Sequence, residues 1–341
     1  MDKIRIGILG VGRFGRLHLH VLQQLPNCEV VAISDLNEDL LQQVSEKYGI
    51  PHTYRNPEEM MKSDLDVIDI VSDESTHGTF AIQALEHGKH VFIEKPIATT
   101  VRDAERIYQL SRERGKQVMV GNISRFAQPY YMMKKSIEAG ALGEIGHIRA
   151  KRDFSRDWFQ SFGKRVHPVY ESGIHDLDLI LWFADSACQE VYAVERSLSG
   201  NRYPDLFTAT LTFANGIVAT LESAWLVPRK GPRNLTETLE LDGTIDAHME
   251  IVGTKGSTQF GTLNTGLSLW SDEEIQVPDY VLWPTEHDGI GGAIRAELQH
   301  FTYQVRKGEE SRVAPLLHSV EALKIADAIV RSGQDKTIVR L

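Results

Sequence analysis

Cysteine and long apolar runs are both scarce in this chain of 341 residues. Its two cysteines, Cys28 and Cys188, lie far apart and form no CxxC pair. This excludes a disulfide-rich scaffold and favours free thiols in a reducing compartment, so we expect a cytoplasmic protein. No apolar run approaches the length of about 18 residues that indicates a membrane span. The N-terminal residues lead straight into a predicted strand, without the apolar segment of a signal peptide.

Positive charge is also in deficit. The 37 Lys and Arg residues are outnumbered by 47 Asp and Glu, which gives a formal net charge of −10. An acidic chain repels phosphate backbones and anionic lipids, so we expect neither nucleic acid nor a membrane as a partner. Metal-ligand spacings are missing as well, since His18 and His20 stand two apart on a predicted helix and do not share a face. No metal site is predicted.

Strands and helices alternate over the first 122 residues. Apolar runs predict strands at 4–9, 29–34, 67–71, 90–93 and 118–120. Helical spacing follows the first strand, and helices are predicted at 37–48, from 57, and at 80–86 and 100–114. Such alternation is typical of βαβ units around a mostly parallel sheet. We therefore predict an α/β Rossmann dinucleotide-binding domain over residues 1–122.

Strand-like stretches dominate after residue 122. They occur at 145–153, 189–197, 205–213, 216–225, 236–242, 247–252 and 257–260, several of them joined by hairpin signals. Helices are predicted at 129–139, 292–307 and 316–332. The pattern predicts an α+β domain over 123–341, built on a large, mostly antiparallel open sheet. We expect it to bind the substrate and to mediate oligomerisation, with the 316–332 helix packing back on the first domain.

A glycine-rich run follows the first predicted strand directly and precedes a helix. It contains Gly10, Gly12, Arg13, Phe14 and Gly15. In this context the first glycine permits a tight turn, the second lets the backbone approach a pyrophosphate, and the third allows close packing of helix on strand. The helix N-terminus offers N–H groups and partial positive charge to phosphates. The run therefore predicts a dinucleotide-binding loop.

Asp35 ends the second predicted strand, about 20 residues beyond Gly15. An acid at this place accepts hydrogen bonds from the adenosine ribose and repels the 2′-phosphate of NADP. The next residues, Leu36 and Asn37, supply no cation for that phosphate, whereas Arg13 is close enough in sequence to reach it. The pattern favours NAD and leaves NADP open.

Two polar residues have the chemistry for hydride-transfer catalysis. Lys95 ends a parallel strand, where open α/β sheets place their ligands, and its ammonium can stabilise a developing alkoxide. His175 stands at the start of a helix predicted at 175–183, and its imidazole can accept an alcohol proton near neutral pH. On residue chemistry alone, each also has a structural alternative: a surface lysine at a strand end, or a histidine at a helix start.

Two further stretches, together with the glycine loop, carry a family resemblance. They are Gly-Lys-His-Val-Phe-Ile-Glu-Lys-Pro at 88–96 and Gly-Ile-His-Asp-Leu-Asp at 173–178. The chain resembles, over essentially its whole length, the Gfo/Idh/MocA family, named for glucose–fructose oxidoreductase, inositol dehydrogenase and a rhizopine-catabolism protein. The resemblance implies that Lys95 is catalytic, that its bond to Pro96 is cis, and that His175 is the general base or proton relay.

The resemblance also marks two departures. The family usually has Asp where this chain has Glu171, so the carboxylate moves outward by one methylene and the substrate class is put in doubt. It more often has Thr-Pro-Asn where this chain has Ser72-Asp73-Glu74, although His77 fits the pattern. With Glu94 and Pro96, the residues Ser72 and His77 are expected on the cofactor side.

The predicted function is NAD-dependent oxidation of a hydroxyl on a cyclic polyol, sugar or sugar acid. Arg152 and Trp158 are expected to line the substrate cleft with Lys95, Glu171 and His175, since polar and aromatic side chains suit a polyhydroxylated ring. One alternative is a glycoside hydrolase that uses NAD transiently, and another is a non-catalytic dinucleotide-binding regulator. The exposed face of the second sheet predicts a homodimer or homotetramer.

Overall fold

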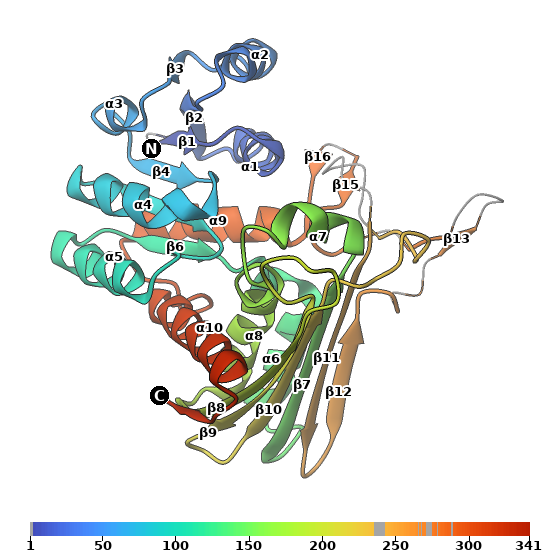
Figure 1. The fold of residues 1–341 in the computed structure, drawn as a ribbon. Coiled ribbons are helices and arrows are strands. Elements are labelled where there is room, and N and C mark those ends of the chain that lie inside the picture. The colour runs from blue at the N-terminus through green and yellow to red at the C-terminus, as the bar shows by residue number, and fades with distance from the viewer. Residues whose placement is uncertain are drawn as a thin grey trace. The chain divides into compact units, whose positions relative to one another are not determined.

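The computed structural model describes residues 3–234, 243–264, 266, 268–270, 275–277, 279–287 and 289–341. The chain forms two compact units. The first contains Met1–Phe126 and Val281–Val320, and the second contains Ala127–Tyr280 and Glu321–Leu341. Figure 1 labels the helices and strands of both units. The domain boundary at residue 122 and the packing of the 316–332 helix on the first domain stay predictions.

The first unit is built on a six-stranded sheet in the order β3-β2-β1-β4-β5-β6. All five strand pairings are parallel. Its strands are β1 (Ile4–Leu9), β2 (Cys28–Ser34), β3 (His52–Tyr54), β4 (Val67–Ile70), β5 (His90–Glu94) and β6 (Val118–Gly121). This confirms the predicted Rossmann architecture. β3 was not predicted, because this edge strand has only three residues and none of them is buried.

The helices of this unit begin and end where local signals place them. They are α1 (Arg13–Gln23), α2 (Glu38–Tyr48), α3 (Pro57–Met61), α4 (His77–Glu86), α5 (Val101–Arg114) and α9 (Gly292–Lys307), with short turns η1 (Glu74–Thr76) and η2 (Ile123–Phe126) and a hairpin of β15 (Thr285–Glu286) and β16 (Gly289–Ile290). The Asn37 side chain caps α2 by accepting the Leu40 N–H, and Gly49 ends it at φ +68°. Thr100 caps α5 in the same way.

The second unit contains a seven-stranded sheet in the order β12-β11-β7-β10-β9-β8-β17. Its strands are β7 (Ile145–Phe154), β8 (Cys188–Arg196), β9 (Leu206–Phe213), β10 (Val218–Ala224), β11 (Ile245–Gly253), β12 (Ser257–Gly261) and β17 (Val339–Arg340). Among the described strands of this sheet only β7 and β10 pair in parallel, so the predicted, mostly antiparallel sheet is confirmed. The strand predicted at 236–242 lies outside the described residues.

The helices of the second unit are α6 (Gln128–Glu138), α7 (Arg156–Phe162) and α8 (Ile174–Ala184), with the π-helical turn η3 (Val169–Gly173) directly before α8 and a small hairpin of β13 (Leu269–Trp270) and β14 (Ile275–Gln276). α10 (Leu316–Asp335) begins in the first unit and ends in the second. α7 and the π turn were not predicted. α7 has only seven residues and no clear apolar stripe, so its helical period is not visible in the sequence.

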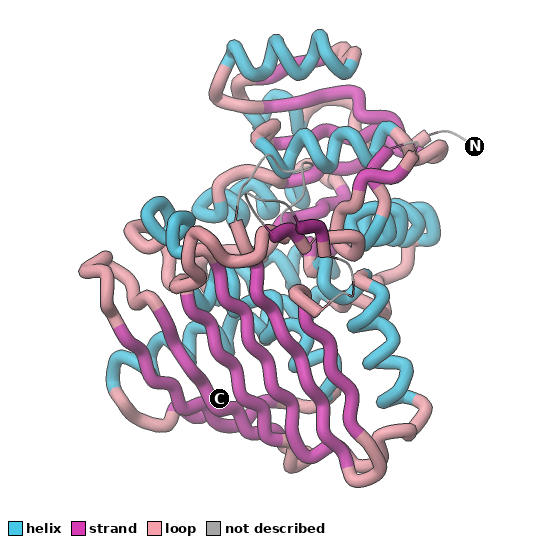
Figure 2. The backbone as a smooth tube through the Cα atoms, turned by 90° about the vertical axis from the view of Figure 1, so that its right-hand side faces the viewer, coloured by secondary structure: helices cyan, strands magenta, loops and turns pink. Residues whose placement is uncertain are grey.

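The large sheet has one buried and one solvent-facing side (Figure 2). A row of aligned residues on the buried side, Ala150, Leu221 and Ala209, faces the core, where α8 and η3 contact β7 and β10. The neighbouring row points to the other side and includes Thr210 and Tyr192. This alternation follows from the two-residue period of a strand, and it places Arg152 on the buried side.

Candidate active site

The glycine loop lies between the end of β1 and the start of α1. Gly10 has φ +92°, and a Cβ there would lie 2.5 Å from the Val71 carbonyl oxygen. A Cβ on Gly15 would lie 2.0 Å from the Gly10 carbonyl oxygen, so only glycine fits either position. A Cβ on Gly12 would meet nothing within 4 Å, and no side chain caps α1. The first turn of α1 therefore stays open to a phosphate group.

Asp35 lies directly beside this loop. One carboxylate oxygen accepts the Val11 N–H at 3.0 Å, and the other accepts the Asn37 N–H at 3.0 Å. These bonds hold the negative charge at the carboxyl end of β2. Leu36, the next residue in the chain, and Arg13 of the glycine loop are both exposed. The predicted residues of the loop and Asp35 are thus brought together at one edge of the sheet.

The segment after β4 is tied to the segment after β5 by His77. Its buried imidazole places Nδ1 2.8 Å from the Pro96 carbonyl oxygen and Nε2 3.1 Å from the Ser72 carbonyl oxygen. Asp73, which departs from the family pattern, caps η1 by accepting the Ser75 N–H at 3.1 Å. The polar residues at 72–77 therefore shape the loop that follows β4.

Glu94 is the last residue of β5, and Lys95 and Pro96 follow it at the carboxyl edge of the sheet. The Lys95–Pro96 bond is cis, as the family resemblance implied. Lys95 is half-buried, and its backbone N–H donates to Glu94 Oε2 at 3.1 Å. Because β1 and β5 are parallel strands of one sheet, Lys95 lies at the same edge as the glycine loop.

Sequence reasoning missed a buried charge cluster behind Lys95. His18, on α1, lies between Asp69 of β4 and Glu94 of β5. Burial alone would lower the pKa of His18, but the charges and hydrogen bonds of the two carboxylates raise it to about 10. The sequence signal that could have revealed this cluster is a polar residue within each of two apolar patterns. His18 lies on the same apolar face of a helix as Leu22, and Asp69 lies inside an apolar strand.

In the second unit, Glu171 and His175 lie within one turn of each other, where η3 runs into α8. Both side chains are half-buried. Ser172 holds this turn: its hydroxyl donates to the Pro168 carbonyl at 2.9 Å, lies 2.6 Å from Ser223 Oγ, and accepts the Trp225 indole N–H at 3.1 Å. π-helical turns of this kind occur frequently at functional sites.

Arg152, predicted to contact substrate, is bound to Asp176 of α8. Its Nε and Nη2 donate to the two carboxylate oxygens at 2.8 and 3.0 Å, and both side chains are almost completely buried. The Tyr130 hydroxyl also hydrogen-bonds the guanidinium. This pair anchors α8 to β7 one residue after His175. Trp158 packs with Phe154 at the rim of an aromatic cluster.

Comparison with known proteins identifies the chain. The family model described as "Oxidoreductase family, NAD-binding Rossmann fold" matches residues 4–122, and the "GFO/IDH/MocA C-terminal domain" model matches residues 130–259. The chain belongs to the Gfo/Idh/MocA oxidoreductase family. Its N-terminal domain is an NAD-binding Rossmann domain.

Relatives in this family include inositol dehydrogenases. The chain is 28% identical to scyllo-inositol 2-dehydrogenase (NAD(+)) of Bacillus subtilis, over 99% of this chain and 96% of that protein. It is 25% identical to myo-inositol 2-dehydrogenase of Thermotoga maritima, over 65% of this chain and 68% of that protein. The scyllo-inositol dehydrogenase of Lactobacillus casei, solved with NAD(H) and scyllo-inositol, shares the fold at a TM-score of 0.83, with 20% identity and 99% coverage of both chains.

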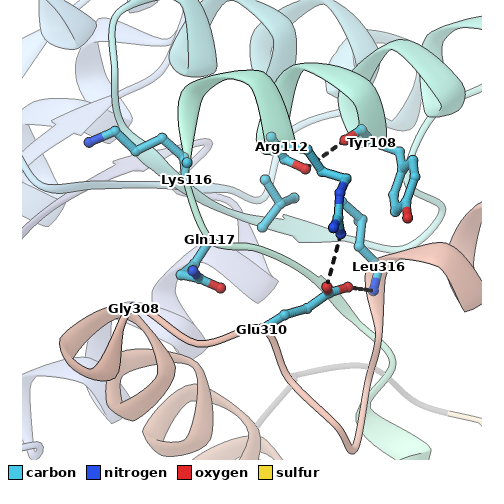
Figure 3. A pocket seen from close by; sticks show the side chains of 10 residues that line it. Tyr108, Arg112, Lys116, Gln117, Gly308, Glu310 and Leu316 are labelled. Atoms are coloured by element: carbon cyan, nitrogen blue, oxygen red, sulfur yellow. Dashed lines mark hydrogen bonds and ion pairs between the residues drawn. The ribbon is translucent and has the colours of Figure 1, made fainter.

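A polar cavity of about 300 Å³ lies elsewhere in the first unit (Figure 3). Arg112 and Lys116 line it with Glu310, which lies 3.6 Å from Arg112 and accepts the Leu316 N–H at 3.3 Å. Val118, the first residue of β6, lines the cavity, which therefore lies at the amino edge of the Gfo/Idh/MocA Rossmann sheet. The glycine loop, Asp35 and Lys95 lie at the carboxyl edge, and the cavity is not part of that site.

Two kinds of feature are absent from the described part of this family member. No three His, Cys, Asp or Glu side chains there come together as ligands for a metal ion. No helix within the same residues has both the length and the apolar character needed to cross a bilayer. Cys28 and Cys188 are both free thiols.

Proposed function

We propose that this chain is an NAD-dependent dehydrogenase that oxidises a ring hydroxyl of a cyclic polyol such as an inositol, or of a related sugar or sugar acid. The observation that carries the proposal is the position of Lys95, which directly follows β5 at the sheet edge that also bears the glycine loop. A cation at the edge of the sheet that bears the cofactor loop suits a reaction in which negative charge develops on an alcohol oxygen. The inositol dehydrogenases among its relatives support the substrate class.

The residues around the glycine loop fit a nicotinamide dinucleotide. The open first turn of α1 and the unobstructed approach at Gly12 suit a pyrophosphate, and the carboxylate of Asp35 suits the adenosine ribose. Ser72 and His77 would line the nicotinamide side. When bound, NAD supplies the hydride acceptor. The charge at Asp35 favours NAD over NADP because it repels a 2′-phosphate.

The catalytic roles follow from the side chains. Lys95 would hydrogen-bond the reacting oxygen and stabilise its developing negative charge. His175 would accept the proton of the same hydroxyl as general base. Glu171, four residues earlier on the π turn, would bind a neighbouring hydroxyl or orient His175. Arg152 would act on the substrate side indirectly, because its ion pair with Asp176 anchors the start of α8. Trp158 would contribute an apolar wall to the substrate cleft.

The test is NADH formation by the purified protein across a panel of inositols, aldoses and sugar acids. At least one cyclic polyol should give NADH, and Lys95→Met should lower kcat by roughly a hundredfold or more. Lys116→Met, at the opposite edge of the same sheet, is the control and should retain wild-type activity. Equal activity in Lys95→Met and Lys116→Met would refute the role of Lys95. Sugar release without net NADH would identify the NAD-using hydrolase instead, and dinucleotide binding without turnover would identify the regulator.

We also propose self-association through the solvent-facing side of the large sheet. Tyr192 and Val194 of β8 are 44% and 52% exposed, and Val218 of β10 is 36% exposed. Apolar side chains on an open sheet face are typical of a subunit interface. Light scattering after gel filtration should give a homodimer or homotetramer, and Val194→Lys should shift it toward the monomer.

The free thiols Cys28 and Cys188 support a cytoplasmic, reducing location.

A further inference from the structure

His18 is buried completely, with 0% of its side chain exposed, and is enclosed by two acids from neighbouring strands. Its Nδ1 lies 3.0 Å from Asp69 Oδ2 and 3.3 Å from Oδ1. Its Nε2 lies 3.3 Å from Glu94 Oε1. The Asp69 side chain is 2% exposed and that of Glu94 is 13% exposed. The three side chains come from α1, β4 and β5, so only the folded sheet brings them together.

This arrangement favours a protonated imidazole. Nδ1 hydrogen-bonds the Asp69 carboxylate, and Nε2 lies within ion-pair distance of Glu94 Oε1, so the imidazolium is the form of His18 that both carboxylates stabilise. The same cation acts on Glu94. Burial alone would raise the pKa of the Glu94 carboxyl, but the hydrogen bond and charge of His18, together with the charges of Lys95 and His77, lower it below its usual range.

Glu94 connects this cluster to the lysine. While Oε1 faces His18, Oε2 accepts the backbone N–H of Lys95 at 3.1 Å. Gly121 of β6 closes the other side, because a Cβ there would lie 2.6 Å from Glu94 Oε1. The carboxylate thus has little room to rotate, and both of its oxygens are used.

We propose that His18 is a positioning residue whose imidazolium keeps Glu94 ionised and in place, so that Glu94 fixes the backbone at Lys95. The proposal rests on the proposed function only for the catalytic role of Lys95. The charged groups involved are Asp69 and Glu94 on either side of His18, and Lys95 and His77 around Glu94. The imidazolium of His18 comes from α1, and neither of the family motifs at 88–96 and 173–178 contains it.

The first experiment needs no activity. In the wild-type protein labelled with ¹⁵N-histidine and ¹⁵N-lysine, both ring nitrogens of His18 should give imidazolium shifts throughout the neutral pH range. The Lys95 amide resonance should stay constant over the same range, since its acceptor remains ionised. A neutral tautomer of His18 at neutral pH would overturn the proposal, whether or not the chain proves to be a dehydrogenase.

The second experiment replaces His18 by a neutral side chain of similar reach. In His18→Gln one of the two acids takes up a proton, so the Lys95 amide shift should titrate near neutrality. The kcat should fall roughly tenfold to a hundredfold at neutral pH and recover as the pH rises, giving an acid limb in addition to the one that the proposed general base His175 gives the wild type. KM should change little, because the His18 side chain is completely buried and is not exposed to a substrate.

His90→Gln is the matched control, since His90 begins the strand that Glu94 ends and lies outside the site. It should leave the pH profile and the Lys95 amide unchanged. A folded His18→Gln whose pH profile and Lys95 amide match those of the wild type would also overturn the proposal. If His18→Gln does not fold, the wild-type titration decides. If no polyol gives NADH with the wild type, while the Lys95 amide titrates in His18→Gln, the proposed function is refuted and the role of His18 stands.

Discussion

Raising the pH should weaken the first unit through His18. Its pKa is about 10 in the folded unit and 6.5 as an unperturbed side chain, so the folded unit holds one more proton than the unfolded chain between these values. The stabilisation is complete below the unfolded pKa and is lost as the pH rises through the folded one. The free energy of unfolding should therefore fall by about 1.2 to 1.4 kcal/mol per pH unit above neutrality, and by at most about 5 kcal/mol in total.

Hydrogen–deuterium exchange read by mass spectrometry can measure this loss locally. Opening free energies for peptides from α1 and β4, corrected for base catalysis of exchange, should decline from about pH 7 to about pH 8.5 with the slope of one proton. Peptides from β9 in the second unit contain no such cluster and serve as the internal control. Thiols remain largely protonated over most of this window, so they contribute little to the slope.

The result that would refute this reasoning is a flat or rising opening free energy for α1 and β4. It would mean that His18 is neutral in the folded unit, or that its acids keep a proton in its place. A decline of the same size in β9 would instead point to a general effect of pH on the whole chain.

Three other predictions concern single side chains. Gly15→Ala should lower the thermal midpoint strongly, because its Cβ would lie 2.0 Å from the Gly10 carbonyl oxygen. Gly12→Ala should lower the free energy of unfolding by about 1 kcal/mol or less and yet weaken NAD binding in calorimetry. Equal melting temperatures of the two variants would contradict this prediction. Asp35→Ser should shift the NADP/NAD preference in kcat/KM at least about tenfold toward NADP, and an unchanged ratio would show that the carboxylate does not select the cofactor. Glu171→Gln should reduce kcat/KM about a hundredfold with little change in melting temperature, while Glu171→Asp should retain more of it; identical losses would indicate a structural role.

Local patterns sufficed for the cofactor half of the site. The glycine loop, Asp35 and the end of β5 are each recognisable from a few neighbouring residues, and parallel strands bring their carboxyl ends to one edge. The caps at Asn37 and Gly49 are local in the same way, since capping depends on adjacent backbone groups. Edge strand β3 and helix α7 could not be predicted from the sequence because neither has a clear apolar period.

The sequence by itself thus determined the Rossmann domain, the mostly antiparallel second sheet and the position of Lys95 at a strand end. Only the tertiary structure decided which polar groups meet. Asp69 lies 51 residues from His18, and Arg152 lies 24 residues from Asp176, so neither pair follows from any local period. The π turn before α8 likewise departs from the helical repeat. Buried charges must be paired, and the partner is chosen by whichever strand or helix packs alongside, which only the folded chain specifies.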